Sequence, residues 1–132
     1  MTGRRPIVFT VVGIVGFAVQ TVALWMLVGH ARLPVVAATL VATEIAVLHN
    51  FAWHVQWTWA DRPAGPVATG LRLLRFNLAN GGVSLLGAAA LMPVFVHGLG
   101  LHYLLANLLT VVACAVVNYL AGDRWVFAPA PR

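Results

Sequence analysis

Four long apolar runs occupy most of this 132-residue chain and constrain its fold more than any other feature. They cover approximately residues 7–28, 34–56, 75–95 and 101–121. A helix needs about 20 apolar residues to cross a hydrocarbon core about 30 Å thick. Hydrophobic residues make up 61% of the sequence and charged residues 8%, so a soluble domain of this size could not bury its apolar surface. We predict an all-α, polytopic membrane protein with four transmembrane helices in one domain, residues 1–132.

The arginines predict the orientation of the chain. All basic residues apart from histidine are arginines: Arg4, Arg5, Arg32, Arg62, Arg72, Arg75, Arg124 and Arg132. Only Arg32 lies on the opposite side of the runs from the others. The positive-inside rule then places both termini and the central loop, residues 61–71, in the cytoplasm. We expect the protein to lie in the cytoplasmic (inner) membrane. The net charge of +5 reflects this bias, and we expect no nucleic-acid partner.

The connections predict two helical hairpins. The loops at residues 29–33 and 96–100 are too short for anything but antiparallel neighbours. The central loop is longer and contains Pro63, Gly65 and Pro66, which we expect to break the helix. Both hairpins should enter from the cytoplasm, as parallel repeats.

One pattern occurs twice, 68 positions apart, and supports a duplication. Asn50-Phe51 is followed by Trp57-Thr58-Trp59, and Asn118-Tyr119 by Trp125-Val126-Phe127. In each copy an amide lies about 10 Å inside an aromatic belt of the kind found at membrane interfaces.

Small residues predict where helices pack closely, because small side chains let transmembrane helices approach one another. Ala38, Ala42 and Ala46 recur every four residues in the second run, and Gly13 and Gly16 lie in the first. We interpret both sets as packing faces rather than ligand sites.

Polar residues inside the apolar runs are candidates for function, because ionisable groups are costly at the bilayer centre. Glu44 lies about 20 Å above the cytoplasmic interface, and Gln20 reaches a similar height. The two side chains could form a structural pair between helices. Alternatively, Glu44 is a titratable or substrate-facing carboxylate in a cavity.

Two further groups could bind a polar head group. Amides share one face of the third run at Asn77 and Asn80, near Ser84. An amide, an imidazole and two indoles share a face at the end of the second run: Asn50, Trp53, His54 and Trp57. Such a face suits a sugar, but tryptophan also occurs at interfaces without a ligand and amides also bridge helices.

Arginine and tryptophan lie together at the cytoplasmic ends. Arg72 and Arg75 precede the third run's apolar core, and Arg124 adjoins Trp125. The planar guanidinium can donate two hydrogen bonds to a phosphate, although attraction to anionic lipids is the alternative. No Ser-His-Asp, paired-carboxylate or Cys-His arrangement is present, and His30, His97 and His102 lack metal-ligand spacing. We expect no catalysis, no cofactor and no metal.

Over about residues 5–127 the chain resembles the GtrA-like family, which also occurs as the membrane domain of some dolichyl-phosphate-mannose synthases. The matching residues are Phe9, Gly13, Ala42-Thr43-Glu44, Asn50-Phe51, Trp57-Thr58-Trp59, Arg75-Phe76, Asn118-Tyr119 and Arg124-Trp125-Val126-Phe127. The resemblance implies translocation of polyprenyl-phosphate-linked monosaccharides across the membrane for cell-envelope polysaccharide or glycolipid synthesis. The expected partners are that lipid, membrane lipids and a second copy of the chain.

This function predicts roles for the candidate residues. The head-group residues would be Glu44, Asn50, Trp57, Arg75, Asn80, Asn118, Arg124 and Trp125, with Gln20, His54, Arg72 and Asn77 as possible additions. Arg75 and Arg124 would receive the phosphate, and Glu44 would face the later part of the head group's path across the membrane. Two alternatives are a membrane anchor that recruits a cytoplasmic polyprenyl-phosphate glycosyltransferase, and a small proton-coupled exporter.

Overall fold

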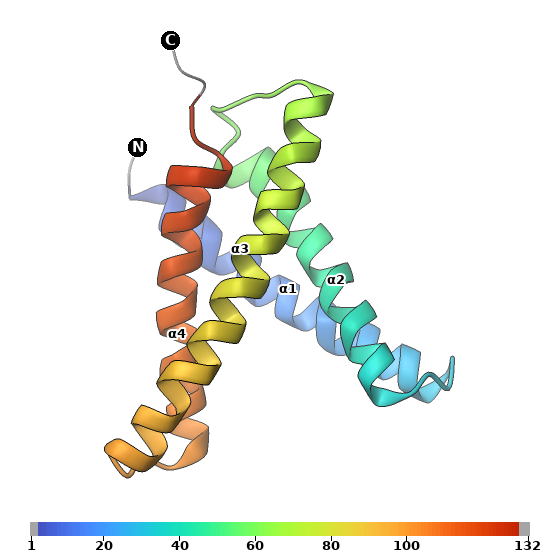
Figure 1. The fold of residues 1–132 in the computed structure, drawn as a ribbon. Coiled ribbons are helices and arrows are strands. Elements are labelled where there is room, and N and C mark those ends of the chain that lie inside the picture. Colours follow the sequence, from blue (N-terminus) through green and yellow to red (C-terminus); the bar gives the residue numbers. More distant parts are fainter. Residues whose placement is uncertain (1–2, 130–132) are drawn as a thin grey trace. The chain divides into compact units, whose positions relative to one another are not determined.

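The computed structural model describes residues 3–129, with side chains at all of these positions except 35, 36, 88, 103, 104 and 107. Every regular element in this part of the chain is a helix, which confirms the all-α prediction (Figure 1). The elements are α1 (Arg4–Gly29), α2 (Val35–Trp53), η1 (His54–Thr58), α3 (Pro66–Pro93), η2 (Val94–Gly98), α4 (Tyr103–Ala121) and η3 (Gly122–Val126), where η denotes a π-helix.

Among the described residues, three stretches are long and apolar enough to cross a membrane. They are Arg4–Gly29, Pro66–Gly98 and Leu108–Val126, and they overlap the first, third and fourth predicted runs. The second predicted run forms α2 and η1, which together cover residues 35–58. The helical architecture and these stretches identify a polytopic membrane protein.

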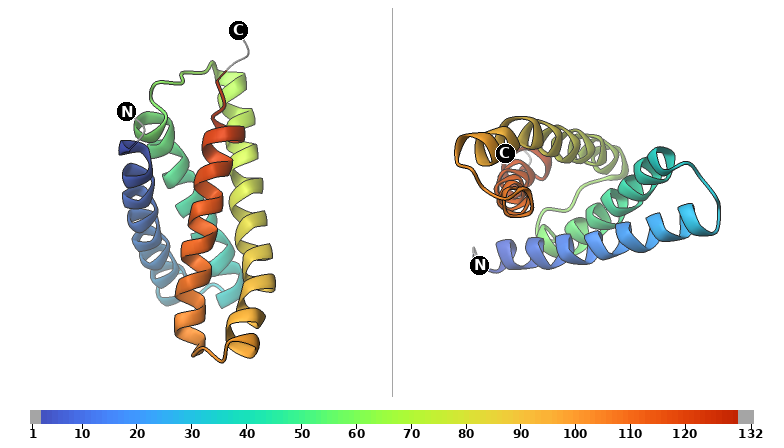
Figure 2. Two further views of the ribbon diagram at one scale, coloured as in Figure 1. Left: turned by 90° about the vertical axis from the view of Figure 1, so that its left-hand side faces the viewer. Right: turned by 90° about the horizontal axis from the view of Figure 1, so that it is seen from below.

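The chain divides into two compact units, Met1–Ala64 and Gly65–Arg132. In the first, α1 packs antiparallel against α2, and in the second α3 packs antiparallel against α4 (Figures 1 and 2). The two hairpins predicted from the short loops are therefore confirmed. It stays a prediction that the two hairpins form one domain and that both enter the membrane from the cytoplasm. Arg132, one of the arginines used to predict the orientation, lies outside the described residues.

The central loop is shorter than predicted, because α3 begins at Pro66. The chain does leave the helical conformation between η1 and α3, as predicted, but Pro66 is the first residue of α3 rather than part of the loop. Proline is well suited to the first position of a helix, where its missing N–H has no partner to lose and its fixed φ matches the helix. Gly65 supplies the extended residue before it, with φ −68° and ψ 170°.

The two hairpins bury corresponding positions of their second helices. In the first hairpin these are Ala38, Ala42 and Ala46, and 68 positions later they are Ala106, Thr110 and Cys114. All six are buried, so the alanine face predicted from the sequence is a packing face, and the duplication extends to the packing of each hairpin.

A glycine of the first helix lies at each of these packing faces. A Cβ atom on Gly16 would collide with the amide of Asn50, and one on Gly87 would collide with the sulfur of Cys114. Gly13, by contrast, has open space where its Cβ would be. Of the two predicted glycines in α1, only Gly16 is a point of close helix approach.

Each copy of the amide-aromatic pattern ends in a π-helical turn. The backbone N–H of Trp59 donates to the carbonyl of His54, and that of Phe127 donates to Gly122, both at 2.9 Å. The outer tryptophan of each motif remains about half exposed, 52% for Trp57 and 47% for Trp125, whereas Trp59 and Phe127 are 1% and 0% exposed. π-helical turns are rare and often lie at functional sites. The recurring unit is therefore one buried aromatic anchor and one exposed indole.

Candidate functional site

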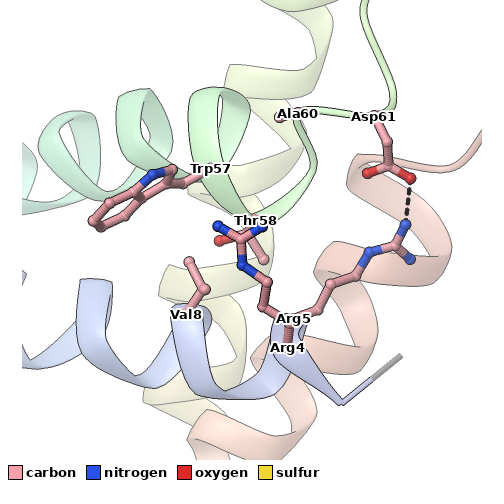
Figure 3. A pocket seen from close by; sticks show the side chains of 7 residues that line it. All are labelled: Arg4, Arg5, Val8, Trp57, Thr58, Ala60 and Asp61. Carbon is pink, nitrogen blue, oxygen red and sulfur yellow. Dashed lines mark hydrogen bonds and ion pairs between the residues drawn. The ribbon is translucent and has the colours of Figure 1, made fainter. Parts of the chain in front are cut away.

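A pocket of about 200 Å³ opens at the end of the first hairpin where α1 starts and η1 ends (Figure 3). We call it the mouth pocket, and its lining residues are Arg4, Arg5, Val8, Trp57, Thr58, Ala60 and Asp61. Figure 3 shows Arg4 pointing toward Thr58, while Arg5 turns to Asp61. The pocket therefore combines cations with one indole.

The two arginines of the mouth pocket differ in their availability. Arg5 forms a hydrogen-bonded ion pair with Asp61. Arg4 makes no hydrogen bond or ion pair with any described residue, and its side chain is exposed. A guanidinium with unused donors in a concave site is suited to an anionic group such as a phosphate.

A second cavity, of about 290 Å³, lies in the same hairpin. We call it the valine pocket, and it is lined by Val11, Val12, Val15, His49, Trp53 and Trp57. Trp57 belongs to both pockets, and its ring centroid lies 5.2 Å from that of Trp53. The two indoles therefore form an aromatic wall that continues from the charged pocket into the apolar one.

His49 links this wall to the helix interface. The indole nitrogen of Trp53 can only donate, so the Nε2 atom of His49, 2.9 Å away, must be the acceptor. The ring proton is then on Nδ1, which donates to Oδ1 of Asn50 at 3.2 Å. The Asn50 amide in turn lies against Gly16. Asn50 is thus held between the helices and connected to the aromatic wall.

His54 does not share a face with Trp53 and Trp57, contrary to the sequence analysis. Its ring stacks on Phe9, with centroids 4.8 Å apart, and lies edge-on to Trp59. Its Nδ1 atom is 2.8 Å from the Thr58 hydroxyl, and both side chains are buried. The π-helical turn from residue 54 to residue 58 departs from the regular α-helical spacing on which that prediction depended.

The second hairpin also places arginines against aromatic rings. The guanidinium carbon of Arg75 lies 5.8 Å from the Trp125 ring centroid, and that of Arg72 lies 5.7 Å from the Phe127 centroid. Both distances suit a cation–π contact. The structure thus pairs Arg75 with Trp125 and Arg72 with Phe127. The neighbouring Arg124 is exposed and makes no hydrogen bond, ion pair or ring contact with a described residue.

The remaining predicted residues lie deeper in each hairpin. Asn77 and Asn80 are half-buried on α3. On α4, Oδ1 of Asn118 is buried and has no hydrogen-bond partner among the described residues. Such an orphaned acceptor is costly unless another group, water included, satisfies it.

Glu44 and Gln20 were both predicted to lie about 20 Å above the cytoplasmic interface. In the structure Glu44 is exposed on α2. Gln20 donates to the hydroxyl of Thr43, the residue next to Glu44, at 3.2 Å. This bond joins α1 to α2 at the depth where the sequence analysis expected Gln20 and Glu44 to pair.

Two residues of the site escaped the sequence analysis. Arg4 was interpreted only as an orientation signal, although its four-residue spacing from Val8 places both on one helix face. His49 was overlooked, although His49, Trp53 and Trp57 recur every four residues. Helical spacing was the available signal in both cases.

A comparison with protein families finds one matching family model. The family model described as "GtrA/DPMS, transmembrane domain" matches residues 8–127, which is nearly the whole chain. The chain belongs to the GtrA/DPMS transmembrane-domain family.

One curated relative is a longer protein than the present chain. It is named dolichol-phosphate mannosyltransferase, from Pyrococcus furiosus, and it is 35% identical over 126 residues. The match covers 94% of the present chain and 34% of the relative. The chain thus spans about a third of that relative's length.

Proposed function

We propose that this GtrA/DPMS domain translocates a polyprenyl-phosphate-linked monosaccharide across the cytoplasmic membrane for cell-envelope polysaccharide or glycolipid synthesis. One observation carries the proposal: an arginine of the first helix lies close to a half-exposed tryptophan of the π-helical turn in both hairpins. In the first hairpin, Arg4 and Trp57 line one pocket, and in the second Arg75 lies over Trp125.

The chemistry of these clusters suits such a lipid. Guanidinium donors can bind the phosphate, and indole faces can stack on the apolar face of a sugar or on an unsaturated chain. The exposed apolar helix surfaces can meet membrane lipids. A flipping pathway then needs a series of polar groups that the head group can contact between the two interfaces.

We assign those deeper contacts to amides and to one carboxylate. Asn50, Asn80 and Asn118 would line the path, with Asn77 and Gln20 beside them, and Glu44 would face its later part. Oδ1 of Asn118 is buried and has no hydrogen-bond partner among the described residues, which supports its inclusion, because a passing hydroxyl group could donate to it. His54 is left out, since its ring is committed to Phe9, Trp59 and Thr58.

Phosphate would be received by Arg75 and Arg124 in the second hairpin, supported by Arg72, and by Arg4 in the first. In this arrangement the arginine-tryptophan clusters of both hairpins face the cytoplasm. A second copy of the chain completes the path of the head group across the membrane. The chain itself would carry out no chemistry on the sugar.

Reconstitution tests the transport proposal directly. The purified chain in vesicles should accelerate movement of a polyprenyl-phosphate glucose between leaflets, followed by accessibility of the sugar to a reagent outside the vesicle. Arg75→Gln should slow that movement, whereas Arg32→Gln, which removes a charge from the opposite end of the first hairpin, should not. Unaccelerated movement by a chain that still binds the lipid would disprove transport.

A second candidate is a membrane anchor for a glycosyltransferase. It is favoured by the relative from Pyrococcus furiosus, a protein named for a transferase activity of which this chain matches about a third. The anchor hypothesis predicts that the exposed loop matters more than the interior. If Asn118→Leu leaves glycan transfer in cells intact, while Arg62→Glu abolishes it together with co-purification of a transferase, the anchor is supported and the flippase is not.

A further inference from the structure

The mouth pocket and the valine pocket of the first hairpin are adjacent and differ in chemistry. The mouth pocket contains two arginines and a carboxylate, and the valine pocket is lined by valines and aromatic side chains. Trp57 forms part of both. An amphiphilic ligand could therefore contact both pockets at once.

The order of residues along the helices gives this pair of pockets a direction. Arg4, Val8, Val11 and Val15 share one face of α1 at helical spacing. Opposite them, Trp57, Trp53 and His49 follow one another along the antiparallel η1 and α2. From Arg4 to Val15 the two adjoining pockets extend about 16 Å along α1, and we call them together the apolar groove and its charged mouth. The lining changes from charged to apolar over that length, as a lipid does from its phosphate to its chain.

The charge of the mouth pocket distinguishes between phosphates. Arg4 and Arg5 contribute two positive charges, and Asp61, paired with Arg5, contributes one negative charge. The remaining single positive charge, on Arg4, matches a phosphodiester, which carries one negative charge. A phosphate monoester carries about −1.5 to −2 at pH 7 and would be left partly uncompensated beside Asp61.

We propose that the first hairpin binds the phosphodiester of a polyprenyl-linked sugar at Arg4, with the first isoprene units of the chain against the valine pocket. It does so in preference to the sugar-free carrier phosphate, a monoester. The sugar then extends past Arg4, away from the apolar groove. This proposal rests on the proposed function, and it adds the place of the phosphate, the course of the chain and the selection for the loaded lipid.

Binding by the full chain in nanodiscs tests the proposal with defined probes. The probes are a short-chain polyprenyl phosphoglucose, the polyprenyl phosphate and the prenol of the same chain length, and dioleoyl phosphatidic acid. Native mass spectrometry measures the bound fraction of each. We expect the phosphoglucose to bind most tightly, and Arg4→Gln to weaken it by about tenfold without changing prenol binding.

Two variants control for charge and for the ion pair. Arg32→Gln removes an arginine from the other end of the same hairpin and should leave binding unchanged. Asp61→Asn releases Arg5, so the mouth pocket gains a second uncompensated positive charge. Polyprenyl phosphate should then gain affinity relative to the phosphoglucose.

A diazirine in the first isoprene unit tests the course of the chain. We expect cross-links to residues of the valine pocket, and Val15→Trp, which fills that pocket, should abolish them.

Cross-links confined to the second hairpin, or tight binding that is insensitive to Arg4→Gln, would overturn the proposal but leave the proposed function standing. Equal binding of phosphatidic acid would overturn the lipid class, and equal binding of the monoester would overturn the selection. Absence of binding of any polyprenyl probe would reject the proposed function as well.

Discussion

The guanidinium carbon of Arg75 lies 5.8 Å from the ring centroid of Trp125, and this contact joins α3 to the π-helical end of α4. Trp125 is 47% exposed, so the indole is not held by burial alone. Its counterpart Trp57 lies in the mouth pocket with Arg4. The arginine-indole arrangement thus recurs with different geometry in the two hairpins.

The contact between Arg75 and Trp125 should be measurable as a coupling energy. In a double-mutant cycle of Arg75→Gln and Trp125→Leu, we expect the unfolding free energy to show a coupling of about 0.5–1 kcal/mol. Reversible unfolding in mixed micelles provides the measurement. A parallel cycle with Arg124→Gln should show none, because Arg124 makes no ring contact with Trp125 or any other described residue. Equal coupling in the two cycles would contradict the cation–π contact.

Gly16 and Gly13 offer a matched test of helix packing. Gly16→Ala should destabilise the first hairpin by about 1–3 kcal/mol, because its Cβ would collide with the Asn50 amide. Gly13→Ala has open space and should be neutral or stabilising by up to about 1 kcal/mol. Unfolding of both variants under identical conditions gives the comparison. A similar effect of the two substitutions would show that α1 and α2 do not meet at Gly16.

The two tryptophans of the first aromatic motif should separate stability from binding. Trp59→Ala removes a buried anchor and should cost about 3–5 kcal/mol of unfolding free energy. Trp59→Phe should cost far less, since Phe127 fills the corresponding position of the second hairpin. Trp57→Ala should leave stability nearly unchanged but weaken lipid binding. Loss of stability in Trp57→Ala as large as in Trp59→Ala would refute the division of roles.

His49 should matter through the two hydrogen bonds it makes. His49→Leu leaves the Trp53 indole N–H and Asn50 Oδ1 without this partner, and should cost about 1–3 kcal/mol. The change should also alter the fluorescence emission of Trp53 in a variant that lacks the other tryptophans. His97→Leu, at an exposed histidine of η2, is the control. Unchanged emission and stability in His49→Leu would argue against the hydrogen-bond chain.

Most of the fold could be predicted from the chain's own patterns, and the exceptions are local. The hairpins, their short loops and the alanine face of α2 followed from hydropathy and spacing. The start of α3 did not, because proline can either end a helix or occupy its first position, and only the chain around Pro66 distinguishes the two.

The candidate site was predicted less completely. The pairing of Arg75 with Trp125 joins residues 50 positions apart, and their order along the chain placed them only at the same end of a hairpin. The mouth pocket and the hydrogen bonds of His49 likewise depend on which helix faces meet. Sequence spacing shows which residues share a face, but not which face packs against the neighbouring helix.

The sequence by itself determined the helical membrane architecture, the two hairpins and the repeat of amide and aromatic residues. These are properties of composition and spacing along one chain, so they need no knowledge of packing. Only the tertiary structure decided that His54 is buried while Trp57 remains accessible, and that Arg5 is paired while Arg4 is available. The physical reason is that a π-helical turn and an antiparallel partner helix determine the direction of each side chain, and neither has a signature in residue spacing.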